Sequence, residues 1–117
     1  MSSLTAGRLV LGIDLGTSRF KAGLFEPSGK LAGEGGADLT MDAHHALRER
    51  SVTDFWHLLS GSVRQALEQA HADENDVEAL VYTSQANTFL LQDKECRPMT
   101  PLILWPDRLA ANLMPKV

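Results

Sequence analysis

The stretch that decides the fold of this chain is LVLGIDLGTSRFK at residues 9–21, and a second apolar run follows it directly. The first apolar run ends in an acid, Asp14, after which the chain turns through Gly16, Thr17 and Ser18. This pattern predicts a β-hairpin whose turn exposes backbone N–H groups, hydroxyls and one carboxylate at a single point. Successive backbone amides form a concavity that binds anions, and a neighbouring carboxylate can hold hydrated Mg²⁺, which prefers oxygen ligands. The hairpin therefore predicts a phosphate-binding turn, with an ordinary glycine turn as the alternative.

The composition fits one small globular domain and argues against two classes of partner. The chain has 117 residues, of which 44% are hydrophobic and 22% charged, and its formal net charge is -4. We expect no nucleic-acid partner, because affinity for a phosphate backbone comes from clustered Lys and Arg, and no such cluster occurs. We expect no membrane partner, since no apolar run approaches the roughly 20 residues that span a bilayer. Cys96 is the single cysteine, which rules out an intrachain disulfide and fits a reducing, cytoplasmic location.

The spacing of apolar residues predicts an α/β order of elements. Strands are expected at residues 8–14, 19–26, 30–37, 77–84, 89–91 and 102–105. Helical spacing predicts an amphipathic helix at residues 54–71 with Thr53 as its N-cap, and a last helix at residues 108–114 capped by Asp107. The first three strands can form a meander and the fourth can return beside the first. That order is the first part of a ribonuclease-H-like α/β domain.

The last predicted helix has barely begun where the chain stops at Val117. We therefore expect an incomplete domain that is the N-terminal piece of a longer protein. A sheet without its later elements would expose an edge, so copies of the chain could associate as a homodimer.

Three segments resemble one known family. They are GIDLGTS at residues 12–18 with Lys21, VEAL at residues 77–80 leading to Ser84 and Gln85, and PLILWPDR at residues 101–108. Together they resemble the N-terminal part of the FGGY carbohydrate kinases, the family of xylulokinase, gluconokinase and glycerol kinase, from Leu9 to the end of the chain. The resemblance implies the fold of the actin, Hsp70 and sugar-kinase superfamily. It also implies that residues 1–117 are the N-terminal part of the sugar-binding domain of an ATP-dependent enzyme, which phosphorylates a hydroxyl of a small-molecule sugar, polyol or sugar acid.

For ATP and Mg²⁺, the resemblance implies a role for each polar residue of the hairpin. Asp14 would orient Mg²⁺ through its bound waters. Lys21, with Arg19 as the alternative, would bring positive charge to the γ-phosphate, or Lys21 would simply face solvent. Amides and hydroxyls for the γ-phosphate would come from Gly16, Thr17 and Ser18. These parts suit phosphoryl transfer, which is catalysed mainly by positioning and charge neutralisation. The family's general base, an aspartate, would lie beyond residue 117, so the chain alone should be inactive.

On the substrate side, the resemblance points to Gln85, Ala86, Asn87, Trp105 and Asp107. Gln85 can form hydrogen bonds with both ends of its amide. Trp105 can form an apolar wall for a sugar face or pack in the core, and Asp107 can contact the substrate or cap the last helix. After the glutamine, xylulokinases usually have Met-His-Gly and glycerol kinases have Arg-Glu. Here Ala86 leaves space and Asn87 keeps a hydrogen-bonding group, which predicts a related but different sugar, polyol or sugar acid.

Two other functions remain open at this point. One is another ATPase of the same superfamily, against which Gln85 and the pairing of Trp105 with Asp107 argue. The other is a non-enzymatic module or sensor that binds sugar or nucleotide without turnover. A P-loop kinase is excluded, because Leu31 rather than Ser or Thr follows the Gly-Lys pair at residues 29–30.

Overall fold

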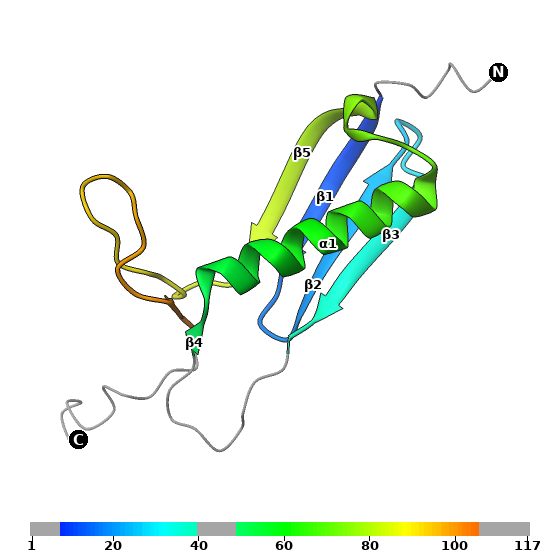
Figure 1. Ribbon diagram of the computed structural model, residues 1–117. Coiled ribbons are helices and arrows are strands. Elements are labelled where there is room, and N and C mark those ends of the chain that lie inside the picture. Colours follow the sequence, from blue (N-terminus) through cyan, green and yellow to red (C-terminus); the bar gives the residue numbers. More distant parts are fainter. Residues whose placement is uncertain (1–7, 40–48, 106–117) are drawn as a thin grey trace.

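The computed structural model describes residues 8–39 and 49–105, and its main part is a four-stranded sheet with one helix on one face (Figure 1). The sheet contains β1 (Leu9–Leu15), β2 (Arg19–Phe25), β3 (Leu31–Asp38) and β5 (Val77–Ser84). The helix is α1 (Val52–Ala70), and a short 3₁₀ helix, η2 (Glu74–Asp76), precedes β5. Two-residue strands, β4 (Glu49–Arg50) and β6 (Leu102–Ile103), pair with each other in a second, small sheet.

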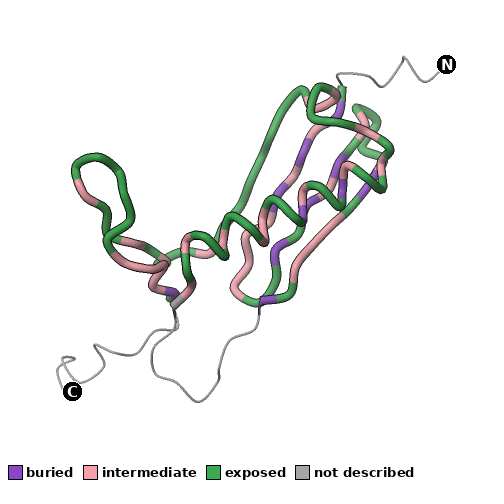
Figure 2. The backbone as a smooth tube through the Cα atoms, in the orientation of Figure 1, coloured by how far each residue is buried: buried purple, intermediate pink, exposed green. Residues whose placement is uncertain are grey.

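The strand order in the main sheet is β3-β2-β1-β5. β1, β2 and β3 are joined as an antiparallel meander, and β5 pairs with β1 in parallel after the crossover through α1. The predicted meander and the predicted return of the fourth strand beside the first are both confirmed. The outer edge of β5 has no partner strand within the described residues, and β5 is exposed along most of its length (Figure 2).

The core lies between the sheet and α1 and follows from the period of the strands. Side chains alternate between the two faces of a strand, and buried residues accordingly alternate along β1 and β2 beneath α1 (Figure 2). The buried cluster comprises Leu9, Leu11, Ile13, Ala22, Leu24 and Ala66. Full burial of a leucine or isoleucine side chain contributes roughly 1.5–3 kcal/mol, so these alternating positions hold the hairpin in place beneath the helix.

α1 rests directly on β3 because β3 carries glycine where the two backbones meet. A Cβ atom at Gly33 would overlap the backbone carbonyl oxygen of Ala66, and one at Gly35 would overlap that of Ser62. Ser62 and Ala66 are the fully buried positions of α1, and both are small. The close approach of helix and strand therefore depends on the absence of side chains on one face of β3.

α1 begins earlier than the sequence predicts. The N-cap is Ser51, whose Oγ accepts the N–H of Asp54 at 3.3 Å, so the expected cap at Thr53 is wrong. Thr53 lies within the first turn, because the helix begins two residues earlier than its apolar stripe indicates. At the other end, His71 adopts a left-handed conformation with φ 52°, and the N–H groups of residues 71 and 72 bond back into the last turn, as in a Schellman motif.

The segment at residues 89–103 projects beyond the end of α1 (Figure 1). The strand expected at residues 89–91 is reduced to an isolated bridge between Phe89 and Ile103, and the strand expected at residues 102–105 is shortened to β6. The two segments bond to each other and to β4 rather than to the main sheet, so neither extends into a regular strand. The last helix expected at residues 108–114 lies outside the described residues.

The turn of this projecting segment is held by Asp93. Its carboxylate accepts the backbone N–H groups of Arg97 and Glu95, both at 2.9 Å, and the Arg97 Nε–H at 2.8 Å. The backbone N–H of Arg97 has the largest effect in keeping the pKa of the Asp93 carboxyl below its usual value. These hydrogen bonds close the turn that begins at Asp93. None of the helices in the described ranges has the length and apolarity that a membrane crossing requires.

Gly61 offers a test of how α1 lies on the sheet. It sits in the middle of the helix on the exposed side, and a Cβ there would meet nothing within 4 Å. Glycine in a helix interior costs about 0.5–1 kcal/mol relative to alanine, so Gly61→Ala should raise the free energy of unfolding by about that amount. The measurement is the urea midpoint of the complete protein with and without the substitution. A lower midpoint would show that position 61 faces a packed surface.

Candidate functional site

The turn between β1 and β2 is tight because of Gly16. Its N–H donates to the carbonyl oxygen of Arg19 at 3.1 Å, and a Cβ at position 16 would lie 2.6 Å from that oxygen. Gly16 does not have a positive φ. Glycine is therefore required here by the close approach of two backbone segments, and the result is a narrow turn that carries Thr17 and Ser18 at its tip.

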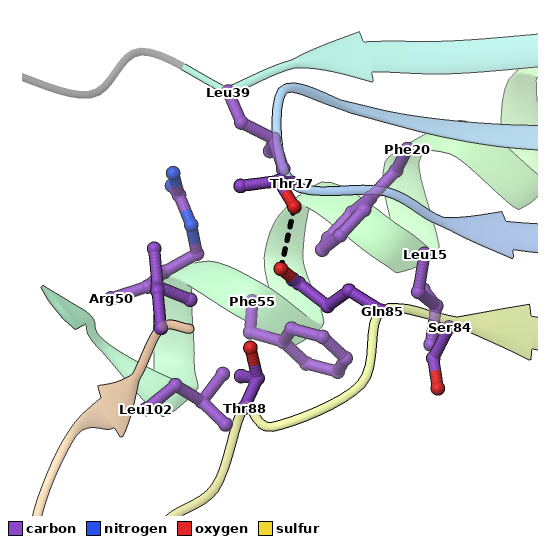
Figure 3. A pocket seen from close by; sticks show the side chains of 11 residues that line it. Leu15, Thr17, Phe20, Leu39, Arg50, Phe55, Ser84, Gln85, Thr88 and Leu102 are labelled. Atoms are coloured by element: carbon purple, nitrogen blue, oxygen red, sulfur yellow. Dashed lines mark hydrogen bonds between the residues drawn. The ribbon is translucent and has the colours of Figure 1, made fainter. Parts of the chain in front are cut away.

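Thr17 joins two residues that are distant in the sequence. The Trp105 indole Nε1–H donates to Thr17 Oγ1 at 2.8 Å. The Thr17 hydroxyl donates to Gln85 Oε1 at 2.6 Å (Figure 3). Gln85 reaches this point because β5 runs parallel to β1, and its own N–H donates to the Leu15 carbonyl oxygen at 3.3 Å. The structure thus brings together one residue predicted for phosphate and two predicted for sugar. Two side chains therefore engage the Thr17 hydroxyl.

A cavity of about 150 Å³ lies next to this hydrogen-bonded group. Its walls come from β1, β2, β4, α1, β6 and the loop after β5 (Figure 3). The lining residues are Leu15, Thr17, Phe20, Leu39, Arg50, Phe55, Ser84, Gln85, Thr88, Leu102 and Leu104. Apolar walls with a few convergent polar groups are typical of small-molecule sites. A cavity of this size has room for several water molecules.

Asp14 and Lys21 form a second group, on the face of the main sheet that α1 does not cover. They are cross-strand partners in β1 and β2, and Lys21 Nζ lies 4.0 Å from Asp14 Oδ2. The neighbouring pair, Ile13 and Ala22, is buried, so Asp14 and Lys21 face away from α1. Their side chains are 49% and 63% exposed, and they border a wide, open hollow of about 380 Å³ together with Thr83 of β5.

The chemistry of Asp14 fits a hydrated magnesium ion. Within the residues that the structure describes, no three His, Cys, Asp or Glu side chains lie close enough to ligate a metal together. Mg²⁺ usually keeps several waters and is held by one or two carboxylates plus substrate phosphates. A single, half-exposed carboxylate is sufficient for that mode of binding. Arg19, the alternative to Lys21, instead forms an ion pair with Asp38 across β2 and β3.

The remaining predicted site residues lie at the margin of the cavity. Ser18 is exposed, and its backbone carbonyl oxygen accepts the N–H of Leu39 at 2.8 Å. Ala86 and Asn87 are exposed and do not line the cavity, and Asn87 has a left-handed backbone with φ 60°. Trp105 is 57% exposed, which argues against the alternative that it packs in the core. Asp107 lies outside the described residues.

Of the residues that line the cavity, sequence reasoning named only Thr17 and Gln85 as site residues. Among those it missed, three bring polar, charged or aromatic groups to the wall. Thr88 accepts the backbone N–H of Trp105 on its Oγ1 at 3.2 Å and lines the cavity. Arg50 and Phe55 also line it, from β4 and from the first turn of α1. Arg50 directly precedes the N-cap Ser51. A correct prediction of where α1 begins would have placed Arg50 at the N-terminal end of the helix, next to the cavity.

Comparisons with known proteins point to one family. The family model described as the FGGY family of carbohydrate kinases, N-terminal domain, matches residues 9–117. A glycerol kinase from Rhizobium meliloti is 28% identical over 113 residues, which are 95% of this chain and 23% of that protein. A xylulose kinase from Klebsiella pneumoniae is 32% identical over 104 residues, which are 89% of this chain and 21% of that protein. The chain thus spans less than a quarter of the length of these curated relatives.

Solved structures give the same result for the fold. The crystal structure of a gluconate kinase from Lactobacillus acidophilus matches with a TM-score of 0.75 and 16% identity, covering 91% of this chain and 21% of that one. A xyloylose kinase from Brucella ovis matches with a TM-score of 0.70 and 27% identity, covering 91% of this chain and 23% of that one.

Proposed function

This chain belongs to the FGGY family of carbohydrate kinases, and from this premise we propose that it forms the N-terminal part of the sugar-binding domain of an ATP-dependent kinase acting on a small sugar, polyol or sugar acid. The predicted α/β fold of the ribonuclease-H-like, actin-like superfamily is confirmed by the sheet order and by the structural likenesses. The observation that carries the proposal is the hydrogen-bonded group of Thr17, Gln85 and Trp105. It joins the turn predicted for phosphate to residues predicted for the sugar.

In this proposal the hairpin binds the phosphates of ATP. The backbone amides at the tip, including that of Thr17, donate to the γ-phosphate. Asp14 holds the waters of Mg²⁺, and Lys21, 4.0 Å away, adds positive charge on the same face. ATP with Mg²⁺ supplies the phosphoryl group and partly neutralises its charge. These residues act by positioning and by electrostatic stabilisation, which together provide most of the catalysis of phosphoryl transfer.

The substrate would lie in and above the cavity beside the turn. Gln85 and Thr88 offer hydrogen bonds at its wall. Trp105, with a half-exposed ring fixed through its Nε1–H, offers a flat apolar surface for a carbon chain. The general base and the remaining ligand contacts would come from other parts of the complete protein, because this chain spans less than a quarter of its curated relatives.

The test is ADP release by the complete protein with Mg-ATP and a panel of pentuloses, hexuloses, polyols and sugar acids. Release that depends on one sugar class would support the kinase and name its substrate class. Binding of Mg-ATP without release on any member of the panel would contradict it. That outcome would favour a sensor that binds sugar or nucleotide without turnover, which is the second function the fold could serve.

Asn87 provides a prediction about substrate choice. Its left-handed φ of 60° is compatible with glycine, so Asn87→Gly removes the side chain and leaves the backbone unstrained. If Asn87 donates to or accepts from the substrate, the relative kcat/KM of the sugars should change about threefold to tenfold, the value of one hydrogen bond, while the KM for ATP stays the same. A change confined to the KM for ATP would remove Asn87 from the sugar site.

A further inference from the structure

We propose that the cavity beside the turn binds its substrate through hydrogen-bond donors and a positive charge, and therefore takes the carboxylate of a sugar acid in preference to the hydroxyls of a polyol. This inference rests on the proposed function and narrows its substrate class. It is carried by the direction of the hydrogen bonds around Gln85 and by the presence of Arg50 in the same wall.

The direction of the hydrogen bonds follows from the Trp105 indole, which can only donate. Thr17 Oγ1 accepts from Trp105 Nε1 at 2.8 Å, so the Thr17 hydroxyl hydrogen is available for Gln85, 2.6 Å away. With Gln85 Oε1 toward Thr17, that hydrogen has an acceptor. With the amide reversed, two N–H donors would point at the Thr17 hydroxyl oxygen, and the hydrogen bond from the Thr17 hydroxyl to Gln85 Oε1 would be lost. The hydrogen bond between Trp105 and Thr17 therefore orients the Gln85 amide so that its Oε1 faces the Thr17 hydroxyl.

The other end of the Gln85 amide is consequently a pair of N–H donors. No hydrogen bond within the described residues uses Nε2, and Gln85 lines the cavity. Thr88 Oγ1 already accepts the Trp105 N–H at 3.2 Å, so the Thr88 hydroxyl has its hydrogen to donate. Arg50, which lies across the cavity from Gln85 (Figure 3), is always cationic and has donors only.

These donors match a carboxylate better than a hydroxyl. Among the lining residues that the structure describes, none is an aspartate or glutamate. The Ser84 and Thr88 hydroxyls can also accept, but Arg50 and the Gln85 Nε2 only donate. An alditol hydroxyl bound between those two groups would leave its own hydrogen without an acceptor, which is costly when the group is buried. A carboxylate only accepts, has about four acceptor positions and gains charge-assisted bonds. Apolar walls such as Phe20, Phe55 and Leu104 lower the local dielectric constant and strengthen those bonds.

The experiment compares matched substrates on the complete protein with Mg-ATP. Gluconate is paired with glucitol and xylonate with xylitol, because each pair differs only at the acid carbon, and xylulose serves as a neutral carbonyl compound. ADP release gives kcat/KM, and calorimetry gives binding independently of turnover. We expect the acid of each pair to have a higher kcat/KM and to bind more tightly, by about tenfold or more, as for a charged hydrogen bond.

Three substitutions assign the selectivity to the named groups. Arg50→Gln and Gln85→Glu should each raise the KM for the acid by about tenfold or more and lower the ratio of kcat/KM for the acid to kcat/KM for the alditol, without a change in the KM for ATP. Thr17→Val removes the hydroxyl that holds the Gln85 amide, so it should lower the ratio of kcat/KM for the acid to kcat/KM for the alditol. The matched control is Arg64→Gln, which removes an exposed arginine of α1 and should alter nothing.

Each outcome decides between the two proposals. Preference for an alditol, or acid turnover and binding that are unchanged in Arg50→Gln and Gln85→Glu, would overturn the donor site while the kinase stands. The proposal would also be overturned if xylulose and the acid had equal kcat/KM, and if that kcat/KM fell in Gln85→Glu but not in Arg50→Gln. Such a result would mean that the cavity binds a neutral carbonyl group without using the charge of Arg50. Tight calorimetric binding of the acid without ADP release would support the donor site and contradict the kinase.

Discussion

Asp14→Ala in the complete protein is expected to lower kcat by about three orders of magnitude, the upper range for removal of one preorganised electrostatic group. The effect should fall on kcat, because a carboxylate that orients Mg²⁺ acts mainly where charge develops on the phosphoryl group. The fold should survive. Asp14 is 49% exposed and its partner Lys21 lies 4.0 Å away, and exposed ion pairs contribute only about 0–1 kcal/mol to stability.

The measurement is steady-state ADP release at a series of Mg²⁺ concentrations. Asp14→Asn, which keeps the shape and removes the charge, should show the same loss and a higher Mg²⁺ requirement. Asp38→Ala is the matched control, because Asp38 is also an exposed carboxylate paired with a cation on the neighbouring strand. Near-normal turnover in Asp14→Ala would show that the hairpin does not hold the metal. Equal losses in Asp14→Ala and Asp38→Ala would point to a structural effect instead.

Gly35→Val is expected to destabilise the protein by about 3 kcal/mol or more, which is the upper range for overpacking a core. A Cβ at position 35 would overlap the backbone carbonyl oxygen of Ser62 and lie 2.9 Å from the backbone N of Ala66. Those atoms belong to the helix backbone, so no rotamer change can relieve the overlap. α1 would have to move away from β3, and the apolar contacts of Ala66 with the buried cluster would be lost.

The free energy of unfolding is measured by urea titration of the complete protein. A global stability of about 5–15 kcal/mol is typical of native proteins, so a loss of this size lowers the midpoint clearly or prevents soluble expression. Gly61→Ala, on the outer side of the same helix, controls for the loss of glycine itself. An unchanged midpoint in Gly35→Val would mean that α1 does not rest on β3 as described.

The sequence predicted the hairpin and the return strand because their signals are local. Alternating apolar residues in β1 and β2 and the glycine turn at position 16 each depend on a few neighbouring residues. The prediction from sequence failed where two local signals competed for the start of the helix. Ser51 and Thr53 are both good N-caps, and the helix begins at the first of them. It also failed at residues 89–91, where an apolar run pairs with the segment before Leu104 instead of joining the sheet.

By itself, the sequence determined the order of strands, the helix that covers them and the residue types at the turn, because period and turn chemistry act over short distances. Only the tertiary structure decided which of those residues meet. Thr17 and Trp105 are 88 positions apart, and Thr17 and Gln85 are 68 apart. The parallel pairing of β5 with β1 and the loop that follows it bring them into contact. Three further features depend on contacts between separate segments, which no local pattern specifies. They are the direction of the Gln85 amide, the position of Arg50 in the cavity wall and the packing of α1 against Gly35.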